Sequence, residues 1–262
     1  QIEIESLWSG RRHIVWNLDR RVNILSGVNG AGKSTIINKV VKGLAAGGEF
    51  PSHMLKGVNL KVFPDDARWI RYDVIRSFDR PVMNSEMLNK LDISLATELD
   101  WQLFNLQRKY LDYQVNIGNR IIATLQGGTA DAAEKAQQLS MPKHTFQDMI
   151  DDLFSETGKT IIRTENEIRL EQMGERLFPQ QLSSGEKQML IILLTVLVQD
   201  NKPHVLFLDE PEVSLHIDWQ GRLIDLILQL NPNVQIILAT HSPAVIMKGW
   251  ADNTTEISDI LI

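Results

Sequence analysis

The sequence predicts an α/β fold with a largely parallel sheet core, an N-terminal antiparallel β element and a helical insertion lobe. Three features of the 262 residues support this prediction. Apolar strands alternate with helices through the last third, three short strands open the chain, and apolar residues recur at three- and four-residue spacing in the middle. Because one core with an insertion accommodates this length, we expect a single domain over residues 1–262.

The core is expected to comprise residues 1–45 and 180–262. Strands are expected at residues 2–8, 14–18 and 22–25, because these runs are apolar and polar turns separate them. A glycine-rich loop and a helix through Leu44 follow. In the last third we expect helices at 185–199 and 215–230, strands at 205–208 and 234–239, and a short helix after Pro243. Both of these strands are almost continuously apolar, which favours a parallel sheet covered on both faces.

The insertion is expected to span residues 46–179 and to be mostly helical. An edge strand is expected at 67–78, and a stripe of apolar residues predicts a long amphipathic helix from about residue 91 to Gly127. This stripe indicates core packing, with a partner-binding face as the alternative. Residues 128–140 are small and polar and are interpreted as a linker or a mobile helix. A helix at 143–156 and a hairpin at 160–163 and 167–171 complete the insertion.

Composition limits the class of protein. Hydrophobic residues make up 43% and charged residues 23%, as in a chain that buries a core. No apolar run reaches the roughly 18 to 20 residues that cross a bilayer, no signal-like lead precedes the first strand, and there is no cysteine. We therefore expect a cytoplasmic protein without a membrane partner. The net charge of -6 argues against nucleic-acid binding over the whole chain, but a local basic stripe in a dimer stays open.

A glycine-rich loop between the third strand and the first helix matches the phosphate-binding pattern G-x-x-x-x-G-K-[ST]. Its glycines allow backbone N–H groups to surround a phosphate, and the helix N-terminus adds positive potential. Lys33 is expected to reach the β- and γ-phosphates of ATP, and the Ser34 hydroxyl to bind Mg²⁺. The predicted nucleotide-binding residues of this loop are Asn29, Gly30, Ala31, Gly32, Lys33, Ser34 and Thr35.

Two carboxylates follow the apolar strand at 205–208. Asp209 and Glu210 are expected at the carboxyl edge of the sheet, next to the phosphate-binding loop. Asp209 is predicted to bind Mg²⁺, and Glu210 to accept a proton from the water that attacks the γ-phosphate. Together with Lys33, these residues predict an ATPase.

Three further strings resemble the ATP-binding cassette (ABC) ATPases, in the branch of SMC-like and OLD-like AAA proteins. Leu182-Ser-Ser-Gly-Glu-Lys-Gln188 resembles the family's signature sequence, Pro211-Glu-Val-Ser-Leu-His216 its D-loop, and Ala239-Thr-His-Ser-Pro243 the segment with its switch histidine. The strings occur in the same order as in the family, and together with the phosphate-binding loop and the acidic pair they include most of the chain's catalytic segments. Ser184 and His216 depart from the transporter pattern, which usually has Gly and Asp there, and both departures fit the OLD-like branch.

The resemblance implies that ATP is hydrolysed between two copies of the chain. In this family the signature sequence caps the nucleotide of the opposite subunit. It therefore implies that Ser183, Ser184, Gly185 and Glu186 bind ATP across a homodimer or higher homo-oligomer, and that His241 contacts the γ-phosphate. The resemblance assigns neither the lobe glutamine nor the adenine-stacking residue. Candidates for stacking are Arg11, Arg12, Trp8 and Trp16, although burial is the more usual role of a tryptophan.

The strings together resemble the compact ATPases of bacterial phage-defence loci. This resemblance implies an ATPase that gates or scaffolds a separate effector protein, such as a nuclease. In one version of this role, ATP turnover is slow and regulatory. OLD-type nucleases carry a TOPRIM domain after the cassette; the chain continues only about 20 residues beyond His241, so nuclease activity is expected from the partner. The alternatives are a DNA-repair ATPase of the RecF or SMC type, which would add nucleic acid as a ligand, and an ABC transporter subunit.

Overall fold

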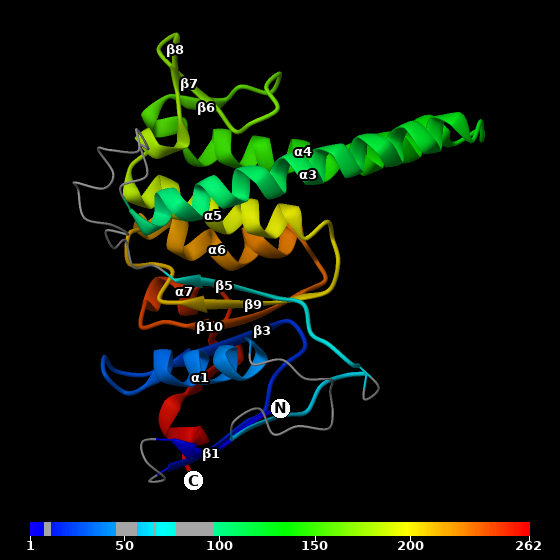
Figure 1. The fold of residues 1–262 in the computed structure, drawn as a ribbon. Coiled ribbons are helices and arrows are strands. Elements are labelled where there is room, and N and C mark those ends of the chain that lie inside the picture. The colour runs from blue at the N-terminus through cyan, green and yellow to red at the C-terminus, as the bar shows by residue number, and fades with distance from the viewer. Residues whose placement is uncertain (8–11, 46–56, 65–66, 77–96) are drawn as a thin grey trace, which may run out of the picture.

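The core of the computed structural model is a five-stranded sheet in which all neighbouring strands run parallel (Figure 1). The strand order is β11-β3-β10-β9-β5. The strands are β3 (Val22–Ser26), β5 (Tyr72–Arg76), β9 (His204–Asp209), β10 (Val234–Ala239) and β11 (Thr254–Glu256). Because these strands are parallel, their carboxyl ends share one edge, where Ser26, Asp209 and Ala239 lie. The predicted α/β class is confirmed, and β5 has the predicted edge position.

An antiparallel sheet of order β2-β1-β4 lies on one side of this core. It contains β1 (Ile2–Leu7), β2 (Arg12–Trp16) and β4 (Val58–Leu60). Helix α1 (Lys33–Ala45) runs between the two sheets and buries Ile36, Ile37 and Val40 between them (Figure 1). The predicted antiparallel element is therefore present, although the third predicted strand, β3, belongs to the parallel sheet.

Helices cover the other face of the parallel sheet in successive layers (Figure 1). Next to the sheet is α6 (Ile217–Leu230), followed by α5 (Ser184–Val198), then α3 (Glu98–Gln126) and α4 (Ala132–Leu153). Helix α5 is buried from residue 186 to residue 197, as expected for an almost wholly apolar helix between two layers. Helices α3 and α4 form a hairpin that extends beyond the sheet. The amphipathic stripe of α3 packs into the core, as predicted.

Two elements of the insertion are longer or larger than expected. Residues 132–153 form one helix, α4, so the helical alternative for residues 128–140 holds from residue 132 and the linker alternative was wrong there. The segment is rich in Ala, Glu, Lys and Gln, which favour helices, and Pro142 does not end it. The predicted hairpin has a third strand: β6 (Lys159–Ile161), β7 (Leu170–Gln172) and β8 (Glu175–Leu177). Met173 and Gly174 join β7 to β8 with φ angles of 52° and 81°, and a positive φ at Met173 is unusual for that residue type.

The structure describes residues 1–7, 12–45, 57–64, 67–76 and 97–262. The expected helix start at residue 91 and the expected end of the edge strand at residue 78 lie outside them. Short helices complete the described fold: η1 (Ser155–Thr157), η2 (Pro179–Gln181), α7 (Pro243–Met247), η3 (Ala251–Asn253) and η4 (Ile257–Ile260). No helix in these ranges combines the length and apolar character needed to cross a membrane.

Candidate functional site

The phosphate-binding loop joins β3 to α1 at the carboxyl edge of the parallel sheet. Gly30 and Gly32 have φ angles of 81° and 105°, which residues with a side chain rarely adopt. A hydrogen bond from Ala31 N to Val28 O closes the loop at 3.1 Å, and α1 begins at Lys33. Val28, Asn29 and Gly30 are exposed at the tip. The predicted loop residues therefore surround the N-terminus of α1, where backbone N–H groups favour an anion.

Lys33 is almost fully buried, with 4% of its surface exposed. Its Nζ donates to the carbonyl oxygens of Gly27 at 2.8 Å and Val28 at 3.4 Å, and lies 3.3 Å from Glu210 Oε1. A buried ammonium group needs such partners because burial without them is costly. The loop thus concentrates a positive charge at the place where the sequence predicts phosphate.

Ser34 and Asp209 meet at the predicted metal site. Ser34 Oγ donates to Asp209 Oδ1 at 2.7 Å, while Asp209 Oδ2 is buried and has no hydrogen-bond partner among the described residues. Burial raises the pKa of Asp209 against the opposing hydrogen bond from Ser34. A hydroxyl, a carboxylate and one unsatisfied buried oxygen suit Mg²⁺, which prefers hard oxygen ligands. The residues present therefore fit both Mg²⁺ and a nucleotide phosphate.

Glu210 follows β9 directly and has a φ of 49°, a left-handed conformation that is uncommon for glutamate. Its backbone N–H bonds to Ala239 O at 2.9 Å, which anchors this turn to the end of β10. The side chain contacts Lys33 on one side and His241 Nδ1 on the other. Burial works to raise the pKa of Glu210, but interactions with Glu212, His241 and Lys33 outweigh it and hold the pKa below its ordinary value.

His241 comes after β10 and is the most exposed member of this cluster, with 47% of its side chain accessible. Its Nδ1 is hydrogen-bonded to Glu210 Oε2. The structure thus brings together all of the predicted catalytic and metal-binding residues, namely Lys33, Ser34, Asp209, Glu210 and His241.

Sequence reasoning missed two groups next to this cluster. Glu212 is 4% exposed and is hydrogen-bonded to Thr240 Oγ1 and to His241 N. Arg76 ends β5 in register with Asp209 and donates from Nη2 to Asn38 Oδ1 of α1 at 2.7 Å. An acid two residues beyond a predicted catalytic acid was a usable signal for Glu212. No sequence pattern indicated Arg76, because its position next to Asp209 depends on the order of the strands in the sheet.

The predicted signature residues surround the N-terminus of α5. Ser183 caps the helix in a reciprocal capping box with Glu186, whose carboxylate also binds Lys159 Nζ at 2.8 Å. Burial acts against the charged form of Glu186, but bonds from Lys159 and Ser183 prevail and lower its pKa. Ser183 and Ser184 are exposed, whereas Glu186 is buried. In Figure 1, α5 and α1 start at the same edge of the fold, with the sheet and α6 between them.

Two of the candidates for adenine stacking fall within the described residues. Trp16 is 1% exposed and packs in the core between α1 and the antiparallel sheet, so it does not stack on a base. Arg12 is exposed on β2. Trp8 and Arg11 lie outside the described residues.

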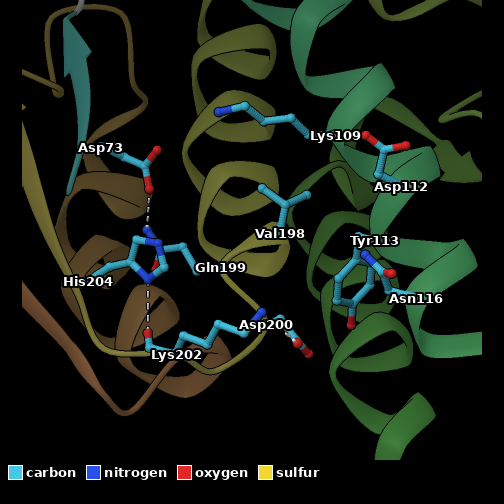
Figure 2. Close-up of a pocket in the computed structure, with 10 residues that line it drawn as sticks. All are labelled: Asp73, Lys109, Asp112, Tyr113, Asn116, Val198, Gln199, Asp200, Lys202 and His204. Carbon is cyan, nitrogen blue, oxygen red and sulfur yellow. Dashed lines mark hydrogen bonds and ion pairs between the residues drawn. The ribbon is translucent and has the colours of Figure 1, made fainter. Parts of the chain in front are cut away.

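A separate cavity of about 250 Å³ lies at the opposite, amino-terminal edge of the sheet (Figure 2). It is bounded by α3, by the loop after α5 and by the starts of β5 and β9. Asp73 and Gln199 are joined there by a hydrogen bond of 2.9 Å, and Asp200 pairs with Arg120 at 2.9 Å. The cavity mixes acidic and basic side chains and contains none of the predicted catalytic residues.

Residues 92–247 match the family described as "AAA domain, putative AbiEii toxin, Type IV TA system". The chain belongs to this AAA family. The matched segment contains the predicted signature residues, Asp209, Glu210 and His241, whereas the phosphate-binding loop precedes it.

Curated relatives of this AAA domain fall into two groups. The Septu protein PtuA of Bacillus thuringiensis is 23% identical over 94% of this chain and 72% of its own length. The phosphate import ATP-binding protein PstB of Pyrococcus furiosus is 34% identical over 28% of this chain, and the dipeptide transport ATP-binding protein DppD of Escherichia coli is 31% identical over 32%. The match spans only 29% of PstB and 26% of DppD.

Among solved structures, the SmcHead bound to the C-winged helix domain of ScpA has a TM-score of 0.53 to this AAA domain. It is 15% identical and the match covers 94% of this chain and 90% of that chain. At this identity the likeness concerns the fold, which is that of an SMC head.

Proposed function

We propose that the chain is a Mg²⁺-dependent, cytoplasmic ATPase that dimerises around ATP and gates or scaffolds a separate effector in bacterial anti-phage defence. One observation carries the ATPase assignment. A buried lysine on a phosphate-binding loop, a hydroxyl–carboxylate pair and a glutamate bonded to a histidine meet at one edge of the sheet. These are the parts that phosphoryl transfer to water requires.

Each residue has a distinct role in this proposal. Lys33 and the amides at the start of α1 bind the β- and γ-phosphates, and Ser34 and Asp209 hold Mg²⁺, which neutralises charge on the phosphates. Glu210 accepts the proton of the attacking water, for which its lowered pKa keeps it ionised. His241 orients Glu210 and contacts the γ-phosphate from its exposed side.

The second copy supplies the remaining contacts. Ser183 and Ser184 are exposed at the N-terminus of a 15-residue helix, whose free N–H groups and dipole attract phosphate. Because α6 and the sheet separate this end from the chain's own phosphate-binding loop, the signature residues serve the nucleotide of the partner (Figure 1). ATP thereby joins two copies, and hydrolysis releases them.

The defence role is supported by the PtuA likeness over most of the chain and by the resemblance of the motif strings to ATPases of phage-defence loci. The short likeness to PstB and DppD supports the ATPase core and not a transport role. A second candidate, a DNA-repair ATPase of the RecF or SMC type, is favoured by the SMC-head fold. Stimulation of ATP turnover by duplex DNA, falling steeply with salt, would support that candidate.

Subunit mixing tests the proposed dimer. Lys33→Ala should disable the chain's own phosphate loop, and Ser184→Glu should place a carboxylate against the partner's γ-phosphate while suiting the first turn of α5. Each variant alone should be inactive. An equimolar mixture should recover up to about a quarter of wild-type turnover per subunit, because half of the dimers are mixed and have one intact site.

Ser155→Glu is the matched control, since Ser155 is exposed and lies on η1. It should retain wild-type turnover. A mixture that stays inactive, although the wild type hydrolyses ATP, would refute shared sites. A wild-type chain that neither binds nor hydrolyses ATP would refute the ATPase itself.

A further inference from the structure

We propose that Glu212 is a positioning residue that holds His241, and through it Glu210, in the arrangement that activates the attacking water. This inference rests on the proposed ATPase function and extends it to a residue on the loop between β9 and α6.

Glu212 is tied to the switch segment after β10. Its Oε1 accepts hydrogen bonds from Thr240 Oγ1 and, at 3.3 Å, from His241 N. Thr240 is fully buried and Glu212 is 4% exposed. Because one glutamate oxygen binds both the residue before His241 and His241 itself, Glu212 determines where the imidazole of His241 is placed.

The same side chain faces Glu210. One carboxylate oxygen of Glu210, one of Glu212 and a ring nitrogen of His241 all lie within 4.8 Å of one another. His241 Nδ1 is hydrogen-bonded to Glu210 Oε2 and lies 3.7 Å from Glu212 Oε1. The three side chains therefore form one cluster, in which a displacement of Glu212 would also move the imidazole that is bonded to Glu210.

The two oxygens of Glu212 differ in their surroundings. Its Oε1 accepts from Thr240 and His241, whereas its Oε2 is buried and has no hydrogen-bond partner among the described residues. Desolvation accordingly raises the pKa of Glu212. The side chain is held by the segment after β10, and His241 connects it to Glu210.

A second set of bonds fixes Glu212 itself. Gln220 Nε2 donates to Leu215 O at 2.9 Å and to Glu212 O at 3.4 Å, and Ser242 Oγ donates to Gln220 Oε1 at 2.7 Å. Gln220 therefore joins the Glu212 loop to the segment that contains Thr240 and His241. These protein groups set the relative position of Glu210 and His241.

The substitution Glu212→Gln distinguishes a positioning role from two other roles that a glutamate could have at this place. Glutamine has nearly the same shape as glutamate, and its oxygen can accept from both Thr240 and His241 N. If Glu212 were instead a proton acceptor or a ligand of a divalent ion, it would act as a carboxylate, and Glu212→Gln would be as damaging as Glu210→Gln.

The test compares steady-state kcat and KM for ATP in four chains: wild type, Glu212→Gln, Glu212→Ala and Glu171→Ala, an exposed control on β7. Glu212→Gln should keep kcat within a factor of about three. Glu212→Ala should lose about 10- to 100-fold in kcat with little change in KM, as expected when the base is misplaced but phosphate contacts remain. Glu171→Ala should match the wild type.

Urea unfolding and nucleotide binding show whether Glu212→Ala is folded. If it is not, Glu212→Asp, which is one methylene too short to reach Thr240 and His241 N, takes its place with the same expected loss of kcat. The inference is overturned if Glu212→Gln is as inactive as Glu210→Gln, or if the shortened variant retains full kcat. A wild type without turnover would overturn the proposed function first, and this inference with it.

Discussion

Lys33 Nζ lies 3.3 Å from Glu210 Oε1, so the cation expected to bind phosphate is paired with the acid expected to activate water. The side chains are 4% and 13% exposed, which shields the pair from screening by solvent and salt. A bound γ-phosphate and Glu210 would both attract Lys33, while repelling each other. Nucleotide binding and Glu210 are therefore coupled through this lysine.

Glu210→Gln should bind ATP more tightly than the wild type and hydrolyse it about 10²- to 10⁴-fold more slowly. The amide removes a negative charge near the phosphates and frees Lys33, but it cannot accept a proton from water. Fluorescent-nucleotide titration and phosphate release measure the two effects, and light scattering should show that the variant stays dimeric with ATP. Lys33→Ala is the control and should lose nucleotide binding; wild-type affinity in that variant would contradict the assignment.

Asp209→Asn should weaken Mg²⁺ binding at the site while leaving the fold intact. Asparagine can still accept the hydrogen bond from Ser34, but the charge that would hold the cation is lost. We expect at least about a tenfold rise in the Mg²⁺ concentration needed for half-maximal turnover. Titration of turnover with Mg²⁺ at fixed ATP measures this shift. An unchanged midpoint would remove Asp209 from the metal site.

The sequence predicted that the candidate site residues would lie together, because they occur in short consecutive runs that follow strands. Gly27 to Thr35 and Asp209 to Glu210 have local patterns, and parallel strands bring their ends to one edge. Glu212 and Arg76 were missed for a different reason. Their roles arise from contacts with Thr240 and Asn38, which are distant in the chain, and no spacing rule contains such contacts.

The insertion was predicted less accurately. The long stripe of α3 repeats at helical spacing and was identified, whereas residues 128–140 lack a strong apolar face, so the sequence left a linker and a mobile helix both open. Their helix is extended by packing against α3 and by favourable local composition. The turn at Met173 was not predictable either, because methionine rarely adopts a positive φ.

Glu186 should give the protein a pH-dependent contribution to stability. Its folded-state pKa lies below the ordinary value of 4.5, so its ionised form stabilises the fold above that pH, and the contribution is lost as the pH falls through the lower folded-state pKa. Glu186→Gln should reduce the free energy of unfolding by about 1–3 kcal/mol at pH 7. The difference from the wild type should vanish at acid pH.

Urea unfolding of both chains from pH 7 down to the acid limit measures this contribution. Glu171→Gln, on an exposed site of β7, is the control and should follow the wild type at every pH. If the loss in the free energy of unfolding of Glu186→Gln persisted unchanged at acid pH, the shape of the Glu186 side chain would account for the effect. The negative charge that binds Lys159 and Ser183 would then not be its cause.

Gly185→Ala should destabilise the contact between the signature turn and the loop after β9. A Cβ at Gly185 would lie 2.5 Å from the backbone oxygen of Ser214, so one of the two segments would have to move. Overpacking of this kind costs about 1–3 kcal/mol.

Gly118→Ala is the matched control, because Gly118 is within α3 and a Cβ there meets no atom within 4 Å. That change should stabilise the protein by about 0.5–1 kcal/mol, as alanine is the better helix former. Urea unfolding measures the change in the free energy of unfolding of each variant relative to the wild type. Equal changes in the two variants would show that the close approach of Gly185 to Ser214 has no energetic role. If the signature turn binds the partner's nucleotide, Gly185→Ala should also reduce ATP-dependent dimerisation, whereas Gly118→Ala should not.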